Sequence, residues 1–295
     1  MATNLAASAP RASGRTARAV AGLSGYALLF PLLALVVTVL IVPLGYILIR
    51  SFQDPSGEWT VEVYRGIASS DVYRASIVDT LVMSTGVTVV CLVMGYLVAH
   101  RMATRWSRIA PAVVGLLLLS FWTGLLIRTF AWMILLGKNG VVAAAAGAIG
   151  VSDLPQMLYN PTGAMIGMVN IMLPYMALTL YSTMQRVDDR TMTAAASLGA
   201  RPLVAFWRIY VPATVPGIAA GCLLVFVITL GFYITPELLG GPETVMISQR
   251  VAKVVQQLLD FQLAGALSLV LLVVTLVLLA IYNRLFSIKD LGGGA

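Results

Sequence analysis

A few charged side chains interrupt stretches of this sequence that are otherwise apolar. Asp79, Arg128 and Glu237 each lie in or at the end of such a stretch. Because a charge in an apolar segment of this length is costly, it usually faces a water-filled cavity or a partner. The carboxylates suit an ammonium group, and Trp122 and Tyr233 offer aromatic faces that attract cations. These five residues are therefore candidates to line one water-filled vestibule.

Each of these residues also has a structural interpretation, which the sequence leaves open. Arg128 and Glu237 are able to pair with each other and hold helices together, and Asp79 is able to cap a helix at a water interface. Aromatic residues near the ends of apolar segments commonly anchor a protein at the membrane surface. Asn170, midway along another apolar segment, predicts a hydrogen bond between helices.

Residue types that carry out catalysis or hold metal ions are sparse. His100 is the only histidine, and the two cysteines lie inside apolar segments, which argues against a disulfide framework. Met165, Met168 and Met172 follow helical spacing and predict packing rather than metal binding. Catalytic and phosphate-binding motifs such as G-x-S-x-G, H-E-x-x-H and G-x-x-x-x-G-K-S/T are missing from the sequence. We therefore expect neither an enzyme nor a chain that binds metal or nucleotide.

The composition indicates which elements position these residues. The 295 residues are 59% hydrophobic and 11% charged, whereas a soluble domain carries about 25% charged residues. The net charge of +7 is spread between apolar segments without a basic stripe, so nucleic acid is not an expected partner. A helix needs about 20 apolar residues to cross the hydrocarbon core. The sequence therefore predicts an all-α integral membrane protein with six transmembrane helices, at 26–49, 78–99, 109–136, 162–181, 217–239 and 263–286.

Lysine and arginine predict the orientation of these helices. They are more frequent in the leader, after the second segment, in the long loop 183–216 and after the last segment than in the other connections. The positive-inside rule then places both termini and the long loop in the cytoplasm. We expect a disordered cytoplasmic leader at 1–25, one six-helix membrane domain at 26–286 and a cytoplasmic tail at 287–295. The apolar segment 141–151 is too short to span and predicts a surface helix or a packed external turn.

The long loop has the composition of two short helices joined by a glycine. Asp188 is suited to cap the first helix, and Asp189 adds negative charge at the positive end of its dipole. The small residues at 193–197 allow another protein surface to approach closely. Gly199 allows a sharp turn, and Pro202 is suited to open the second helix. An apolar face on that second helix is predicted from the spacing of Leu203, Phe206, Trp207 and Tyr210.

This loop resembles the E-A-A loop of ABC importer permeases of the binding-protein-dependent type. The family pattern is Glu-Ala-Ala, three residues, Gly, nine residues, then Ile-x-Leu-Pro. Thr193 stands at the Glu position, so no carboxylate is available there for a salt bridge, and Val211 replaces Leu. The resemblance implies that the loop docks onto a separate ATPase. The residues expected to form the docking loop are Asp188, Thr193, Ala194, Ala195, Gly199, Ala200, Ile209 and Pro212.

Other motifs narrow the resemblance to the spermidine/putrescine class of these permeases. They are Phe-Trp-Thr at 121–123, Ile-Arg-Thr-Phe-Ala-Trp at 127–132, Leu-Pro-Tyr at 173–175 and Thr-Pro-Glu-Leu-Leu-Gly-Gly-Pro at 235–242. The resemblance implies a type I ABC importer permease, with both termini inside, in the bacterial cytoplasmic (inner) membrane. Its expected substrates are polyamines or related small amine or amino-acid-like solutes.

The resemblance also implies the partners of the chain. They are a second permease subunit in a heterodimer, two ATPase subunits and an extracytoplasmic substrate-binding protein, within membrane lipid. No cofactor is expected in this chain, since ATP and magnesium belong to the ATPase. The alternative is a secondary transporter or channel without an ATPase. Such proteins commonly show internal repeats or paired broken helices, and the sequence shows neither.

Overall fold

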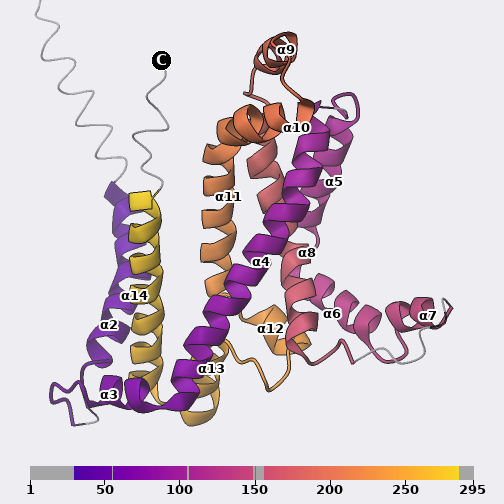
Figure 1. Cartoon of the computed structure of the whole chain (residues 1–295). Coiled ribbons are helices and arrows are strands. Elements are labelled where there is room, and N and C mark those ends of the chain that lie inside the picture. Colours follow the sequence, from indigo (N-terminus) through magenta and orange to yellow (C-terminus); the bar gives the residue numbers. More distant parts are fainter. Residues whose placement is uncertain (1–29, 55, 105, 149, 151–155, 286–295) are drawn as a thin grey trace, which may run out of the picture.

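The computed structural model describes residues 30–54, 56–104, 106–148, 150 and 156–285 (Figure 1). Regular structure in these residues is helical, apart from an isolated antiparallel bridge between Gln53 and Trp59. The expected leader at 1–25 and tail at 287–295 lie outside the described residues. The elements, in chain order, are η1 (Val37–Ile41), α2 (Val42–Arg50), α3 (Glu62–Ser69), α4 (Asp71–Thr104), α5 (Ala110–Trp122), α6 (Leu125–Leu136), α7 (Val141–Ala148), α8 (Pro161–Met184), α9 (Asp189–Ser197), α10 (Pro202–Ala205), η2 (Phe206–Tyr210), α11 (Val211–Leu230), α12 (Ile234–Leu239), α13 (Ile247–Lys253), η3 (Val254–Leu258) and α14 (Phe261–Leu285).

Six helical segments are long and apolar enough to cross a membrane, which confirms the predicted all-α class. They are Phe30–Arg50, Asp71–Thr104, Leu125–Ala148, Pro161–Met184, Pro202–Leu230 and Phe261–Arg284. The short segment predicted at 141–151 forms the helix α7, which buries none of its residues against the rest of the chain. It is therefore helical over residues 141–148 rather than a turn.

The third predicted helix, at 109–136, is not continuous. The chain leaves the helical conformation at Thr123 and Gly124, both of which have extended ψ angles, and this divides the segment into α5 and α6. Only α6, together with α7, reaches the length of a spanning segment, while α5 is a shorter apolar helix. Hydropathy alone does not reveal this break, because the residues on both sides of it are apolar.

The fifth predicted helix, at 217–239, is wrong at both ends. The helical path begins at Pro202, inside the long loop, and runs without interruption to Leu230. The chain then leaves the helix and restarts as α12, in which Pro236 occupies the first turn. Proline lacks the N–H that a helix interior requires, whereas the first turn leaves such groups unpaired. A restart before Pro236 therefore avoids a broken hydrogen bond.

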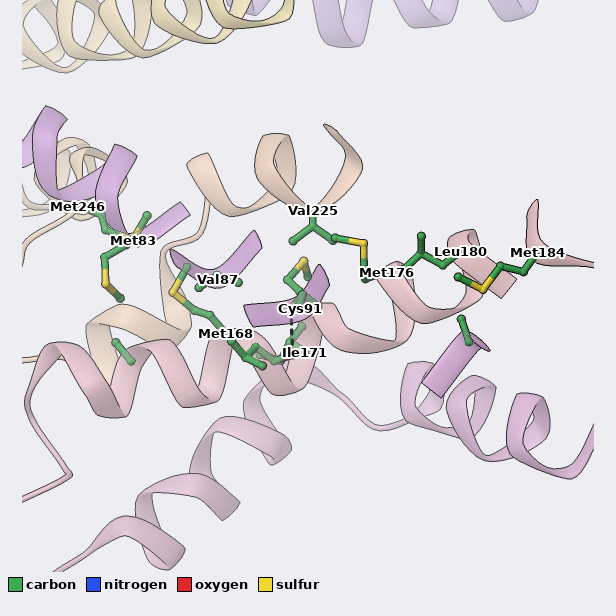
Figure 2. Close-up of a cluster of buried hydrophobic side chains, with 14 of the residues drawn as sticks. Met83, Val87, Cys91, Met168, Ile171, Met176, Leu180, Met184, Val225 and Met246 are labelled. Atoms are coloured by element: carbon green, nitrogen blue, oxygen red, sulfur yellow. Dashed lines mark hydrogen bonds between the residues drawn. The ribbon is translucent and has the colours of Figure 1, made fainter. Parts of the chain in front are cut away.

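The core lies where α4, α8 and α11 pack against one another. Figure 2 shows the side chains at this junction, which are rich in methionine. Met168 and Met172 are fully buried and Met165 packs against them, so the predicted packing role of these three residues is confirmed. At the crossing of α8 and α11, a Cβ on Gly217 would lie 2.6 Å from the Cβ of Thr183, so only glycine permits this close approach. We call the buried cluster at this junction the methionine seam; its methionines are Met83, Met168, Met172, Met176, Met184 and Met246.

The two ends of the helical array carry different elements. Figure 1 shows α9 and α10 at one end of the array. The first spanning helix, which contains α2, starts toward this end, and α14 finishes toward it. The short helices α3, α12 and α13 lie at the opposite end. This arrangement agrees with a topology in which the long loop, the start of the first spanning helix and the end of α14 share one side of the membrane.

Candidate functional site

The first helix of the long loop, α9, begins with a side-chain cap. The Oδ1 atom of Asp188 accepts a hydrogen bond from the backbone N–H of Arg190 at 2.9 Å. This satisfies one of the N–H groups that a helix start leaves unpaired, as the sequence predicts.

The end of α9 explains the spacing between the alanines and Gly199. The N–H of Gly199 donates to the carbonyl of Ala196, and the N–H of Ala200 donates to the carbonyl of Ala195, both at 3.0 Å. This pair of bonds is the Schellman arrangement, which requires a left-handed residue just past the helix. Gly199 supplies it with φ of +80°. The Ala-Ala-x-x-x-Gly pattern is thus a device that ends one helix and turns the chain into the next.

The two faces of α9 have different environments. Ala195 is buried, and Met192 packs against the methionine seam. Thr193 and Ala194 are exposed, and Leu198 at the end of the helix is 88% exposed. Ala195 therefore holds α9 against the membrane helices, whereas the outward face is formed by its neighbours.

The second half of the loop continues directly into α11. Pro202 opens α10 as predicted, and the π-helical turn η2 joins it to the spanning helix. Tyr210 is buried and Phe206 is partly buried, but Leu203 and Trp207 are 73% and 65% exposed. The single apolar face predicted for these residues is therefore wrong, because it divides into a packed pair and an exposed pair. Of the remaining docking-loop residues, Ala200 and Ile209 are partly buried and Pro212 is exposed.

At the opposite end of the molecule, Glu237 on α12 is held by a residue that the sequence analysis missed. Gln249 is buried near the start of α13, and its Nε2 donates to Glu237 Oε2 at 2.7 Å. Its Oε1 accepts from the backbone N–H of Met246 at 2.8 Å. Both ends of the amide are thus used, so the side chain has one orientation. Its place three residues after the helix cap is a known capping position and was the available signal.

Helix α4 contacts the same region through two hydroxyl groups. Thr80 Oγ1 accepts a hydrogen bond from the N–H of Ile247 at 2.9 Å, and Ser76 Oγ accepts one from Arg250 Nε at 3.1 Å. Asp79 lies between them in sequence and is partly buried. Since α4 begins at Asp71, Asp79 is about two turns inside the helix. The interpretation of Asp79 as a helix cap is therefore wrong.

Arg128 and Glu237 do not form the ion pair considered as their structural role. The ion pair between Arg74 and Asp71 is the only one in the described part of the chain. Arg128 instead donates to the carbonyls of Ser120 and Thr123 at the end of α5. A positive charge there satisfies free carbonyls and complements the helix dipole.

The other polar and aromatic candidates are less enclosed. Trp122 is 87% exposed at the end of α5, and Tyr233 is partly buried just before α12. Asn170 is exposed on α8 and makes no hydrogen bond within the described residues, so the predicted bond between helices is not formed within this part of the chain and stays a prediction for a helix of another subunit. Among these residues there is also no cluster of three His, Cys, Asp or Glu side chains that would hold a metal ion.

Together, these helices define the class of the protein as a multi-pass helical membrane protein. Residues 11–290 match the family of the binding-protein-dependent transport system inner membrane component, and the chain belongs to this family. It is therefore a multi-pass inner membrane permease subunit rather than an enzyme.

Individual relatives agree with this assignment. The chain is 34% identical to the spermidine/putrescine transport system permease protein PotB of Escherichia coli (strain K12), over 72% of this chain and 78% of that protein. It is 31% identical to the protein of the same name from Haemophilus influenzae, over 76% of this chain and 79% of that protein. A chain of a bacterial alginate ABC transporter, solved with an alginate-bound periplasmic protein, has the same fold with a TM-score of 0.74. It is 21% identical, and the alignment covers 92% of this chain and 96% of that one.

Proposed function

We propose that this chain is one of two permease subunits of an ATP-driven importer for polyamines or related small amine or amino-acid-like solutes. The observation that carries the coupling to ATP is the capped helix α9 with its turn at Gly199. Its inward face carries the buried Ala195 and the packed Met192, and its outward face is exposed. The family membership and the similarity to spermidine/putrescine permeases support the same function.

The outward face of α9 is suited to dock an ATPase subunit. Thr193, Ala194 and Ser197 are small and exposed, so a partner backbone is able to approach closely. Leu198 adds an exposed apolar side chain at the end of the helix. A partner that covers this side chain removes apolar surface from water, which favours association. ATP and magnesium are held by two copies of that ATPase, and this chain binds neither.

A cationic substrate is supported by the carboxylates at the opposite end. Glu237 is partly buried, and the amide of Gln249 provides a hydrogen bond that stabilises its carboxylate. Asp79, on the neighbouring part of α4, adds a second negative charge. Tyr233 and Trp122 offer aromatic faces for an ammonium group, and Arg128 holds the turn that positions Trp122.

A second permease subunit is supported by Asn170. This amide is exposed near the middle of the spanning helix α8. A polar group at that depth requires water or another protein, because lipid offers it no hydrogen bonds. A pore shared between two different permease chains supplies both. An extracytoplasmic binding protein delivers substrate to the end that carries Glu237.

The test is purification of the tagged chain from its native membrane, followed by mass spectrometry and an ATPase assay in proteoliposomes. We expect an ATPase and a second permease to co-purify, and spermidine with the binding protein to stimulate ATP hydrolysis. Leu198→Asp is expected to release the ATPase, whereas the control change Val61→Asp, at an exposed position of the loop before α3 at the opposite end of the molecule, leaves the ATPase bound. Recovery of a lone, ATP-independent oligomer would instead indicate a channel or secondary transporter.

A further inference from the structure

Helix α4 connects the two ends of the molecule without interruption. It has 34 residues and contains no proline, which corresponds to a length of about 50 Å at about 1.5 Å per residue. It packs against α8 and α11 along this length. A displacement imposed at one end of such a helix therefore reaches the other end.

The inner end of α4 meets the loop through a group of aromatic rings. The ring of His100 lies 4.8 Å from that of Tyr210 and 5.3 Å from that of Phe206, measured between ring centres. Tyr96, one turn earlier on α4, lies 6.2 Å from Phe206 and shares a 3.1 Å hydrogen bond between its hydroxyl and that of Thr214. The edge-to-face angles of 71° to 87° are those that aromatic pairs prefer. We call these five residues the aromatic joint.

The imidazole of His100 is held by packing. Its Nδ1 atom is buried and has no hydrogen-bond partner among the described residues. The neighbouring rings come from η2, where the helix widens into a π-turn between α10 and α11. Such turns are frequent at functional positions. A ring at position 100 is thus the feature that the joint requires, rather than a titratable nitrogen.

The aromatic joint is continuous with the docking helix. Tyr210 belongs to the buried methionine seam, and Met192 of α9 packs against the same cluster. Phe206 and Tyr96 pack against it as well. Because this packing is dense, movement of α9 against the seam displaces the rings that grip α4.

The outer end of α4 is hydrogen-bonded to α13, the helix whose Gln249 bonds Glu237. Thr80 accepts the hydrogen bond from the N–H of Ile247, the first residue of α13. Two residues further along α13, Gln249 donates to Glu237. The first turn of α13 and the side chain of Gln249 thus connect the hydroxyl on α4 to the carboxylate.

We propose that α4 is the rod that links ATPase docking to the outer carboxylate, with His100 and Thr80 as positioning residues at its two ends. The proposal rests on the proposed function, since it assumes that an ATPase docks on α9. It assigns a role to two residues that contact neither the ATPase-facing surface of α9 nor Glu237 itself. The coupling also works in the opposite direction: a loaded binding protein that engages the outer end of α4 changes the position of α9 through the same helix.

The experiment measures ATP hydrolysis by the purified complex in proteoliposomes, with and without spermidine-loaded binding protein. His100→Ala removes the ring, and His100→Phe keeps a ring but removes the nitrogens. Thr80→Val removes the hydroxyl, and Thr80→Ser keeps it. Leu97→Ala, at a 61% exposed position of α4 next to the joint, is the matched control. The amount of assembled complex is measured for each variant.

His100→Ala and Thr80→Val are each expected to lower the stimulation by loaded binding protein by about 2- to 30-fold, while unstimulated hydrolysis and assembly stay at the wild-type level. His100→Phe, Thr80→Ser and Leu97→Ala should keep the stimulation. The double variant His100→Ala/Thr80→Val should lose no more stimulation than the more impaired of the two single variants, because both residues act on one path. Wild-type stimulation in both single variants, or losses that only follow assembly, would overturn the proposal. A wild-type complex that shows no stimulation would instead refute the proposed function.

Discussion

Replacement of Gly199 by alanine tests whether the turn after α9 depends on backbone conformation alone. Gly199 has φ of +80°, and no atom beyond its two chain neighbours lies within 4 Å of the position that a Cβ would take. Steric contact with neighbours is therefore excluded as a cause of any effect. The left-handed conformation costs a residue with a Cβ about 1–2 kcal/mol relative to glycine.

This free energy shifts the equilibrium between the closed and the open turn by a factor of about 5 to 30. The two bonds from Gly199 to Ala196 and from Ala200 to Ala195 are lost when the turn opens. We expect hydrogen exchange of the peptide 194–204 to rise by that factor in Gly199→Ala. Stimulated ATPase activity of the complex should fall with it, because α9 is no longer held in its docking orientation.

Two further variants separate strain from other causes. Gly199→Asn should lie between the wild type and alanine, since asparagine tolerates the left-handed region better than most residues. Gly115→Ala, in the interior of α5 with no atom within 4 Å of the new Cβ, should leave exchange in the loop unchanged. Wild-type exchange in Gly199→Ala would refute the reasoning, because it would show that the turn does not depend on the φ angle of this residue.

Three other changes address separate parts of the structure. Gln249→Leu leaves the carboxylate of Glu237 and the N–H of Met246 without their partner, which should cost about 1–3 kcal/mol and raise the KM for spermidine uptake in vesicles. Gly217→Ala places a Cβ 2.6 Å from that of Thr183 and should lower the Tm of the purified chain by an overpacking cost of about 1–3 kcal/mol, which Thr183→Gly should partly restore. Hydrogen bonds, first from the Ser56 side chain and then from backbone N–H groups, hold the pKa of Asp54 below its usual value. These hydrogen bonds should persist above the usual pKa of an aspartate and be lost as the pH falls through the lowered pKa of Asp54. Hydrogen exchange from pH 7 to pH 3 measures this loss, and Asp54→Asn should show it at every pH.

The features that follow from local sequence were predictable. The number of spanning helices follows from apolar length, and the cap at Asp188 and the turn at Gly199 follow from residue type. The predicted role of the methionines on α8 is also confirmed, because helical spacing places them on one face. The restart of the helix before Pro236 was not predictable from proline alone, because Pro174 and Pro216 lie inside the continuous helices α8 and α11.

The contacts that depend on three-dimensional arrangement were not predictable from one sequence. Glu237 and Gln249 are twelve residues apart, and Thr80 bonds a backbone group 167 residues away. Arg128 was expected either to line a pathway or to pair with a carboxylate, but it caps the end of a helix whose existence the hydropathy pattern conceals. In each case the hydrogen-bond partner depends on where helices end and how they pack, and a local sequence pattern does not contain this information.

The methionine seam has a chemical consequence of its own. Met168, Met172 and Met176 are shielded by α4, α8 and α11, so an oxidant in water reaches their sulfur atoms only when these helices separate. Oxidation of methionine to its sulfoxide makes an apolar side chain polar, and a polar group cannot return to this interior without cost. The extent of sulfoxide formation at these positions would therefore record how often the bundle opens during turnover. The same chemistry would lock an opened subunit out of its transport cycle until a reductase restored the thioether.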